Sequence, residues 1–160
     1  NPSTPIDVNN IARQLNCRVI YDQLHGAAGY TFRKFINNQW RYVIVIANDM
    51  NNVNYSPQQI HYRQRFTLAH ELGHILLHNH LNWNTVETPL DDILEVEANW
   101  FASRLLMPDY TFNSIADLLP EILTDKCQIN YQAAIKRIKK VDIRISSQLI
   151  RNALMLENQL

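Results

Sequence analysis

The chain has 160 residues, of which 46% are hydrophobic and 19% are charged, a composition typical of one globular domain and unlike a disordered or fibrous chain. Fifteen Lys and Arg residues balance fifteen Asp and Glu residues, so the net charge gives no argument for nucleic acid or a membrane surface as partner. No run of 18 apolar residues is present, the start resembles no signal peptide, and two distant cysteines predict no disulfide framework, so we expect a protein of the reducing cytoplasm.

The first third of the chain predicts a short helix followed by a small sheet. Asp7 can cap a helix that runs to about Asn16, with apolar residues at helical spacing. Runs of β-branched and aromatic residues, separated by glycine and asparagine, then predict three strands at Arg18–Tyr21, Ala28–Phe32 and Arg41–Ala47. We expect these strands to form a mainly antiparallel sheet.

Two longer helices follow. Ser56-Pro57-Gln58-Gln59 combines an N-cap, a first-turn proline and a capping-box glutamine, and its helix is expected to run to about His78. Thr88-Pro89 is expected to start the second helix, which Met107-Pro108 ends. Shorter helices are then predicted at Ser114–Leu119, Pro120–Cys127, Tyr131–Lys140 and Ser146 to about Glu157.

These elements predict an α+β fold. We expect a single domain over residues 1–160, with a sheet-containing part of about residues 1–80 and a helical part of about residues 81–160. The small sheet is expected to pack on the first long helix, and its edge strand is expected to bind an extended peptide.

The stretch His70-Glu71-Leu72-Gly73-His74 lies within the first long helix. Residues four apart on a helix differ by about 40° around its axis, so His70 and His74 project side by side and can share one Zn²⁺. Glu71 is rotated by about 100° from His70, which suits a general base acting on a water better than a third ligand. Gly73 costs roughly 1 kcal/mol in a helix, which indicates that another backbone or a substrate comes close. Because chance produces such a pattern in roughly one sequence in a hundred, a third ligand is needed to decide.

Several residues could supply that third ligand: His78, His80, Glu87, Glu95 and Glu97. His78 lies two turns and about 80° from His70, so we expect a solvated or capping histidine, and His80 is similar. Glu95 shares its helix face with small residues that permit close approach of another helix, whereas Glu97 shares its face with larger ones. We therefore favour Glu95 as ligand, and Glu97 could instead pair with Arg104.

Three blocks of this sequence resemble the signature of the ImmA/IrrE metallopeptidases, in the order and spacing of that family. They are Arg63–His74, Glu95–Ala102 with its E-x-x-A-N pattern, and Leu105–Pro108. The resemblance implies a zincin whose Zn²⁺ is ligated by His70, His74 and Glu95, the first glutamate of the second block. It also implies cleavage of a helix-turn-helix repressor encoded nearby, which relieves repression of mobile-element, phage-defence or stress-response genes.

Two other classes of function stay open. A toxin–antitoxin or other interaction protein with little protease activity would need the metal ligands but not the base, so the presence of Glu71 favours catalysis. A DNA-associated protein is the second, because the helices predicted between Pro120 and Lys140 could form a helix-turn-helix. Weak nucleic-acid contact could then involve Lys136, Arg137, Lys139 and Lys140, although a solvated helix face that covers the core is the favoured interpretation.

Overall fold

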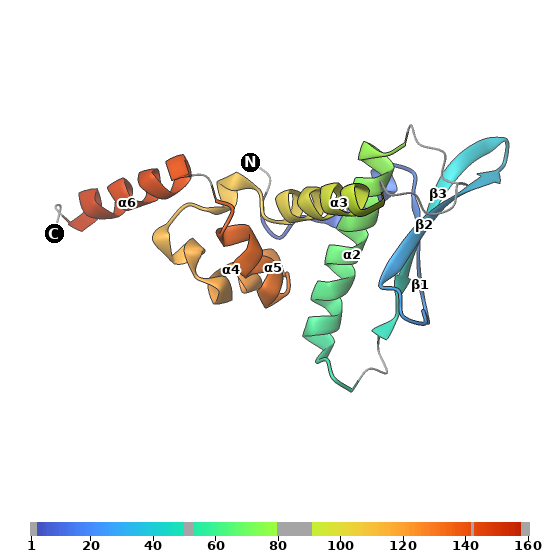
Figure 1. Cartoon of the computed structure of the whole chain (residues 1–160), viewed down its shortest axis with the longest axis horizontal. Helices are drawn as coiled ribbons and strands as arrows, with labels where there is room; N and C mark the ends of the chain where they lie inside the picture. Colours follow the sequence, from blue (N-terminus) through green and yellow to red (C-terminus); the bar gives the residue numbers. More distant parts are fainter. Residues whose placement is uncertain (1–2, 50–52, 80–90, 142, 158–160) are drawn as a thin grey trace. The chain divides into compact units, whose positions relative to one another are not determined.

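The computed structural model of this chain describes four segments, residues 3–49, 53–79, 91–141 and 143–157. The chain divides into two compact units, of which one is Asp7–Ala102 and the other combines Asn1–Ile6 with Ser103–Leu160. The first unit holds the sheet and the long helix, and the second is helical (Figure 1). The predicted α+β class is confirmed, and the assignment of a single domain over residues 1–160 stays a prediction.

The sheet has three strands, β1 (Arg18–Asp22), β2 (Gly29–Ile36) and β3 (Gln39–Ala47), in the order β1-β3-β2. β2 and β3 form an antiparallel hairpin, whose turn at Asn37 and Asn38 has φ angles of 52° and 60°. Positive φ at both turn residues matches the twist of hairpin strands, and asparagine tolerates it better than most residues. β1 pairs with β3 in parallel, so the sheet is mixed and the longer of its two pairings is antiparallel.

Two helices pack on this sheet. α2 (Pro57–Leu77) lies along β2 and β3 (Figure 1). α1 (Val8–Gln14) contacts both β1 and α2. Between them lies the core of the unit, to which β3 contributes a continuous buried run, Val43–Ala47. β3 is the central strand, because it pairs with β1 on one side and with β2 on the other.

The starts of α1 and α2 follow the predicted caps. Asp7 Oδ1 accepts a hydrogen bond from the Asn10 amide at 2.9 Å. Ser56 and Gln59 form the complete capping box, because the Ser56 hydroxyl accepts from the Gln59 amide at 3.2 Å and the Gln59 side chain accepts from the Ser56 amide at 2.8 Å. These bonds satisfy amide groups that a helix start otherwise leaves without partners.

α3 (Asp91–Leu106) passes close to α2 at Gly73. A Cβ atom placed on Gly73 would lie 3.1 Å from the Ala98 Cα atom and 3.1 Å from the Phe101 ring. The missing side chain therefore admits another backbone, as one of the two sequence interpretations held. The predicted end of α3 before Met107-Pro108 is confirmed, whereas its predicted start at Thr88-Pro89 lies outside the described residues.

Gly73→Ala is expected to lower the free energy of unfolding by about 1–2 kcal/mol. Alanine favours the helix by roughly 1 kcal/mol, but overpacking against a neighbouring backbone typically costs more. Because the Ala98 Cα atom cannot rotate away as a side chain can, α2 and α3 must separate. Chemical denaturation of the metal-free protein measures the change, and an equal or higher free energy of unfolding would contradict this account of Gly73.

The second unit consists of short helices and α6. Their bounds are η2 (Asp109–Thr111), η3 (Ile115–Leu118), α4 (Pro120–Cys127), α5 (Tyr131–Ile138) and α6 (Ile143–Glu157). The predicted helix pair with a turn between Cys127 and Tyr131 is confirmed, and Gln128 in that turn adopts the left-handed conformation with φ of 53°. Among the described segments, none of the helices combines the length and the hydropathy that a membrane-spanning helix needs.

Arg137 is buried in this unit and does not belong to an exposed basic face. Its Nε donates to the Met107 carbonyl at 2.9 Å, its Nη2 donates to Asp109 Oδ1, and its guanidinium lies over the Phe112 ring. The lysines grouped with it by the sequence interpretation are exposed: Lys136, Lys139 and Lys140. A buried charge is tolerated only when it is paired and hydrogen-bonded, and Arg137 meets this condition through Asp109 and Met107. Its role is therefore structural.

Candidate metal centre

Three side chains from two helices meet in the first unit. His70 and His74 project from α2, one turn apart, and Glu95 reaches them from α3. The Nε2 atoms of the two histidines are 3.0 Å apart, and Glu95 oxygens lie 3.2 Å from His70 Nε2 and 3.0 Å from His74 Nε2. Among the described residues, these three side chains form the one group of His, Cys, Asp or Glu whose ligand atoms lie close enough together to hold a metal ion.

The spacing and chemistry of these atoms fit a divalent metal ion. Ligands about 2.0 Å from a tetrahedral Zn²⁺ lie about 3.3 Å from one another, close to the separations in this site. Two imidazoles and one carboxylate are also the donor set that leaves a fourth position open in catalytic zinc sites. Lone-pair atoms this close repel one another unless positive charge lies between them, so the cluster suits a cation.

The protonation of the histidines is compatible with this use. His70 Nδ1 lies 3.2 Å from the Asn99 side-chain oxygen, which can only accept, so the proton resides on Nδ1 and the lone pair on Nε2 faces Glu95. Burial lowers the pKa of His74, and protonation of the neighbouring His70 would lower it further. His74 is therefore neutral at physiological pH, the form in which imidazole binds metals.

Glu71 is buried beside the cluster and is held from the sheet. Its carboxylate oxygen Oε2 accepts a hydrogen bond from the Thr31 hydroxyl on β2 at 2.7 Å. Burial raises the pKa of Glu71, although the Thr31 hydrogen bond acts in the opposite direction, as a protonated His70 would. A carboxylate with a raised pKa is a stronger base near neutral pH, as general-base catalysis requires.

A close approach of β2 to α2 allows the Thr31 contact. A Cβ atom on Gly29, at the start of β2, would lie 2.6 Å from the Thr67 methyl group, 2.9 Å from the Val45 carbonyl and 3.5 Å from Glu71 Oε1. Any larger residue at position 29 would thus force β2 away from α2. Gly29 and Thr31 together set where the Glu71 carboxylate lies.

If Glu71 acts as a general base in a metal-loaded enzyme, Thr31→Val is expected to move the acidic limb of its pH–kcat/KM profile to higher pH. The Thr31 hydroxyl stabilises the ionised form of Glu71, so its removal raises the pKa of Glu71 further. A general base acts only when ionised, so activity at acidic pH falls more than activity at alkaline pH. Peptide hydrolysis across a pH series measures this, with Thr67→Val on α2 as the control of matched shape.

An unchanged acidic limb in Thr31→Val, or an equal displacement in Thr67→Val, would contradict the role assigned to the Thr31 hydroxyl. A fall in activity that is the same at every pH would also contradict it.

The structure corrects two expectations about residues near the cluster. His78 is the C-cap residue of α2, as one interpretation held, but it is buried instead of solvated. Glu97 contacts His78 and not Arg104, whose guanidinium pairs with Asp109 at 2.9 Å. The other ligand candidates, His80 and Glu87, lie outside the described residues.

Sequence reasoning missed the contact roles of Thr31 and Asn99. Asn99 lies four residues after Glu95, on the same face of α3, so helical spacing offered a signal that it approaches the histidines. Thr31 is 40 residues from Glu71 and carries no motif, so only the packing of β2 on α2 reveals it.

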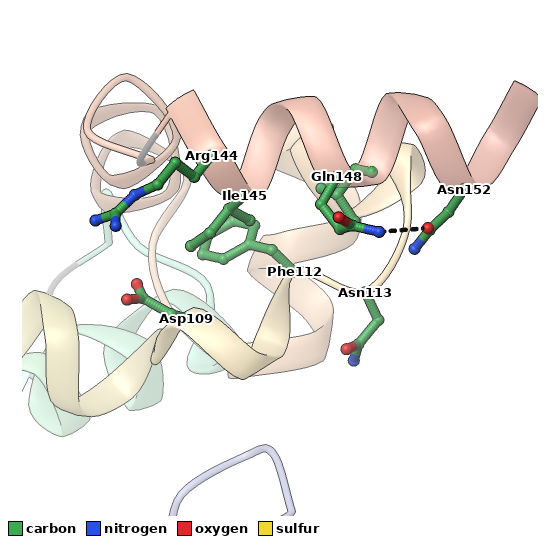
Figure 2. A pocket seen from close by; sticks show the side chains of 8 residues that line it. Asp109, Phe112, Asn113, Arg144, Ile145, Gln148 and Asn152 are labelled. Atoms are coloured by element: carbon green, nitrogen blue, oxygen red, sulfur yellow. Dashed lines mark hydrogen bonds between the residues drawn. The ribbon is translucent and has the colours of Figure 1, made fainter.

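The second unit contains a separate pocket of about 430 Å³ between η2 and α6. Figure 2 shows Phe112 and Ile145 inside it, with Asp109 and Arg144 at one end and a hydrogen bond of 2.8 Å between Gln148 and Asn152 at the other. Its described lining residues include no histidine or cysteine and one acidic residue. The pocket therefore lacks the donor set of a catalytic metal site.

Comparison with known proteins yields two matches. The peptidase family described as "IrrE N-terminal-like domain" matches residues 12–139, a range that includes His70, Glu71, His74 and Glu95. Metallopeptidase ImmA of Bacillus subtilis (strain 168) is 45% identical to this chain over 53 residues. That match covers 31% of this chain and 31% of ImmA, so it spans less than a third of either protein.

Proposed function

We propose that this chain, which belongs to the family of peptidases with an IrrE N-terminal-like domain, is a zinc-dependent endopeptidase. The observation that carries the proposal is the convergence of two imidazole nitrogens and a carboxylate within 3.0–3.2 Å, beside a buried glutamate. In this proposal His70, His74 and Glu95 are the Zn²⁺ ligands, and Glu71 is the general base.

Zn²⁺ held by His70, His74 and Glu95 would supply the Lewis acidity that polarises a peptide carbonyl and acidifies a water. Glu71 takes the proton of the attacking water on Oε1, because Oε2 is held by the Thr31 hydroxyl. Glu71 then gives this proton to the leaving amine as the peptide bond breaks. Asn99 accepts a hydrogen bond from the Nδ1–H of His70, which leaves the lone pair of His70 Nε2 available to a metal.

The proposed substrate is an extended segment of a helix-turn-helix repressor encoded near this gene, whose cleavage relieves repression. β2 supports this mode of binding, because it pairs with β3 on one side and forms an edge among the described strands. An extended peptide can add to such an edge through main-chain hydrogen bonds. Thr31 joins this strand to Glu71, so a peptide aligned on β2 would pass beside the general base.

Incubation of the zinc-loaded protein with the helix-turn-helix protein encoded beside its gene tests the proposal. We expect one discrete cleavage in an interdomain region, which a chelator abolishes and added Zn²⁺ restores. Glu71→Gln is the control, and we expect it to bind the repressor without cutting it. Stable binding without cleavage by either protein would instead support a regulatory or toxin–antitoxin interaction protein.

The proposal places the protein in the reducing cytoplasm, an environment compatible with the two buried free thiols of Cys17 and Cys127. Weak contact with nucleic acid through the exposed Lys136, Lys139 and Lys140 is a further part of the proposal. Duplex DNA binding that falls steeply with salt would support that contact, and no binding at low ionic strength would remove it.

A further inference from the structure

His78, at the end of α2, connects the candidate metal centre to a second glutamate of α3. Its Nδ1 lies 3.0 Å from Nδ1 of His74, and its Nε2 lies 2.9 Å from a carboxylate oxygen of Glu97. The His78 ring is buried, whereas the Glu97 side chain is about half exposed. Glu97, His78 and His74 thus form a continuous chain of contacts that ends at the cluster.

The protons of this chain can be assigned from its ends. A carboxylate only accepts, so His78 Nε2 carries a proton and donates a hydrogen bond to Glu97. In a neutral imidazole the other nitrogen is then an acceptor, so His78 Nδ1 accepts a hydrogen bond from the Nδ1–H of His74. His74 Nε2 is left with a lone pair, and it is the atom that faces His70 and Glu95.

We propose that His78 and Glu97 are positioning residues that hold His74 in the tautomer and ring orientation required to bind the metal. The inference rests on the zinc site of the proposed function. Metal-binding histidines usually donate their second ring nitrogen to a carboxylate or carbonyl, and here a buried imidazole connects the histidine to its carboxylate. α3 then serves the site twice, directly through Glu95 and indirectly through Glu97.

The two histidines of the cluster are held differently. His70 donates to the neutral amide of Asn99, whereas His74 donates into a chain that ends on a charged group. Hydrogen bonds with an ionised partner are roughly twice as strong as neutral ones. His78 is also enclosed, so its two ring bonds face little competition from water, and its loss should matter more than neutralisation of the half-exposed Glu97.

Zinc affinity of the full chain, measured by competition with a chelator, tests the inference. We expect His78→Phe to weaken Zn²⁺ binding by about 10- to 100-fold and Glu97→Gln by a smaller factor, up to roughly tenfold. Asp92→Asn is the matched control, because it removes one exposed charge from the same helix, and we expect it to keep the wild-type affinity. Thermal unfolding of each metal-free variant separates positioning from general damage to the fold.

The double variant His78→Phe/Glu97→Gln distinguishes an effect of Glu97 that passes through His78 from a direct effect of its charge on the metal site. If Glu97 acts through His78, Glu97→Gln has no further effect on zinc affinity in the His78→Phe background. An equal loss in both backgrounds would mean that Glu97 acts directly as a charge, and the inference would fail. The visible spectrum of bound Co²⁺ should change in His78→Phe and Glu97→Gln, and should stay the same in Asp92→Asn.

Failure of the proposed function and failure of the positioning role give different results. A wild-type protein that binds no Zn²⁺ would overturn the proposed function itself. Zinc binding by the wild type, with unchanged affinity and Co²⁺ spectrum in Glu97→Gln and His78→Phe, would overturn only the positioning role. If His78→Phe does not fold, Glu97→Gln tests the inference alone, because the Glu97 side chain is half exposed and its replacement should not disturb folding. An unchanged zinc affinity in Glu97→Gln would then contradict the positioning role.

Discussion

Glu71→Gln is expected to lower kcat/KM for peptide hydrolysis by about 10²- to 10⁴-fold while the protein still binds Zn²⁺. Glutamine has the shape of glutamate, and its carbonyl oxygen can still accept the hydrogen bond of the Thr31 hydroxyl. It cannot take a proton from water at neutral pH, so the loss falls on the chemical step. The proposed ligand atoms of His70, His74 and Glu95 are untouched, so zinc content should stay at the wild-type level.

Measuring the stability of this variant tests whether its loss of activity comes from a loss of folding. Burial raises the pKa of Glu71 in the folded protein, so the stability that this group contributes is present below its unfolded pKa and declines as pH rises through its folded pKa. Replacement by a neutral residue removes that decline. The metal-free variant should therefore be at least as stable as the metal-free wild type at neutral pH, as measured by denaturant unfolding.

Two results would contradict the assignment of Glu71 as the base. One is retention of wild-type hydrolysis by Glu71→Gln. The other is loss of bound Zn²⁺, which would make Glu71 a ligand.

Glu95→Gln is expected to weaken Zn²⁺ binding by more than about 100-fold, the upper end of the range for an outer partner. A neutral amide oxygen replaces a charged carboxylate oxygen that lies 3.0–3.2 Å from both imidazole nitrogens. Glu97→Gln is the matched comparison, since it makes the same change two residues away on α3 and contacts the cluster only through His78. Its effect on zinc affinity should be clearly smaller.

Unfolding with and without metal gives an independent measure of the Glu95 prediction. A ligand that binds the folded protein raises its unfolding temperature, by more as its concentration exceeds the dissociation constant. We therefore expect Zn²⁺ to raise the unfolding temperature of the wild type and of Glu97→Gln more than that of Glu95→Gln. A larger loss in Glu97→Gln would mean that the third ligand has been assigned to the wrong glutamate.

Sequence reasoning succeeded where a feature depends on residues within a few positions of one another. The cap at Asp7 and the capping box at Ser56 are local hydrogen bonds between residues three apart, so both helix starts were predictable. The side-by-side placement of His70 and His74 follows from helical geometry alone. The choice of Glu95 needed more, namely its face of small residues and the resemblance of its block to a known family.

Contacts between residues far apart in the chain could not be predicted from local sequence patterns. Thr31 reaches Glu71 only because β2 packs on α2 across 40 residues of sequence, and the glycine that permits this approach also lies on β2. The parallel pairing of β1 with β3 and the burial of Arg137 are likewise contacts between elements distant in the chain. The sequence alone determined the α+β class, the helix starts and which side chains share a helix face, because these depend on short-range geometry. Only the tertiary structure brought the second glutamate of α3 to His78, since that contact depends on how two helices meet.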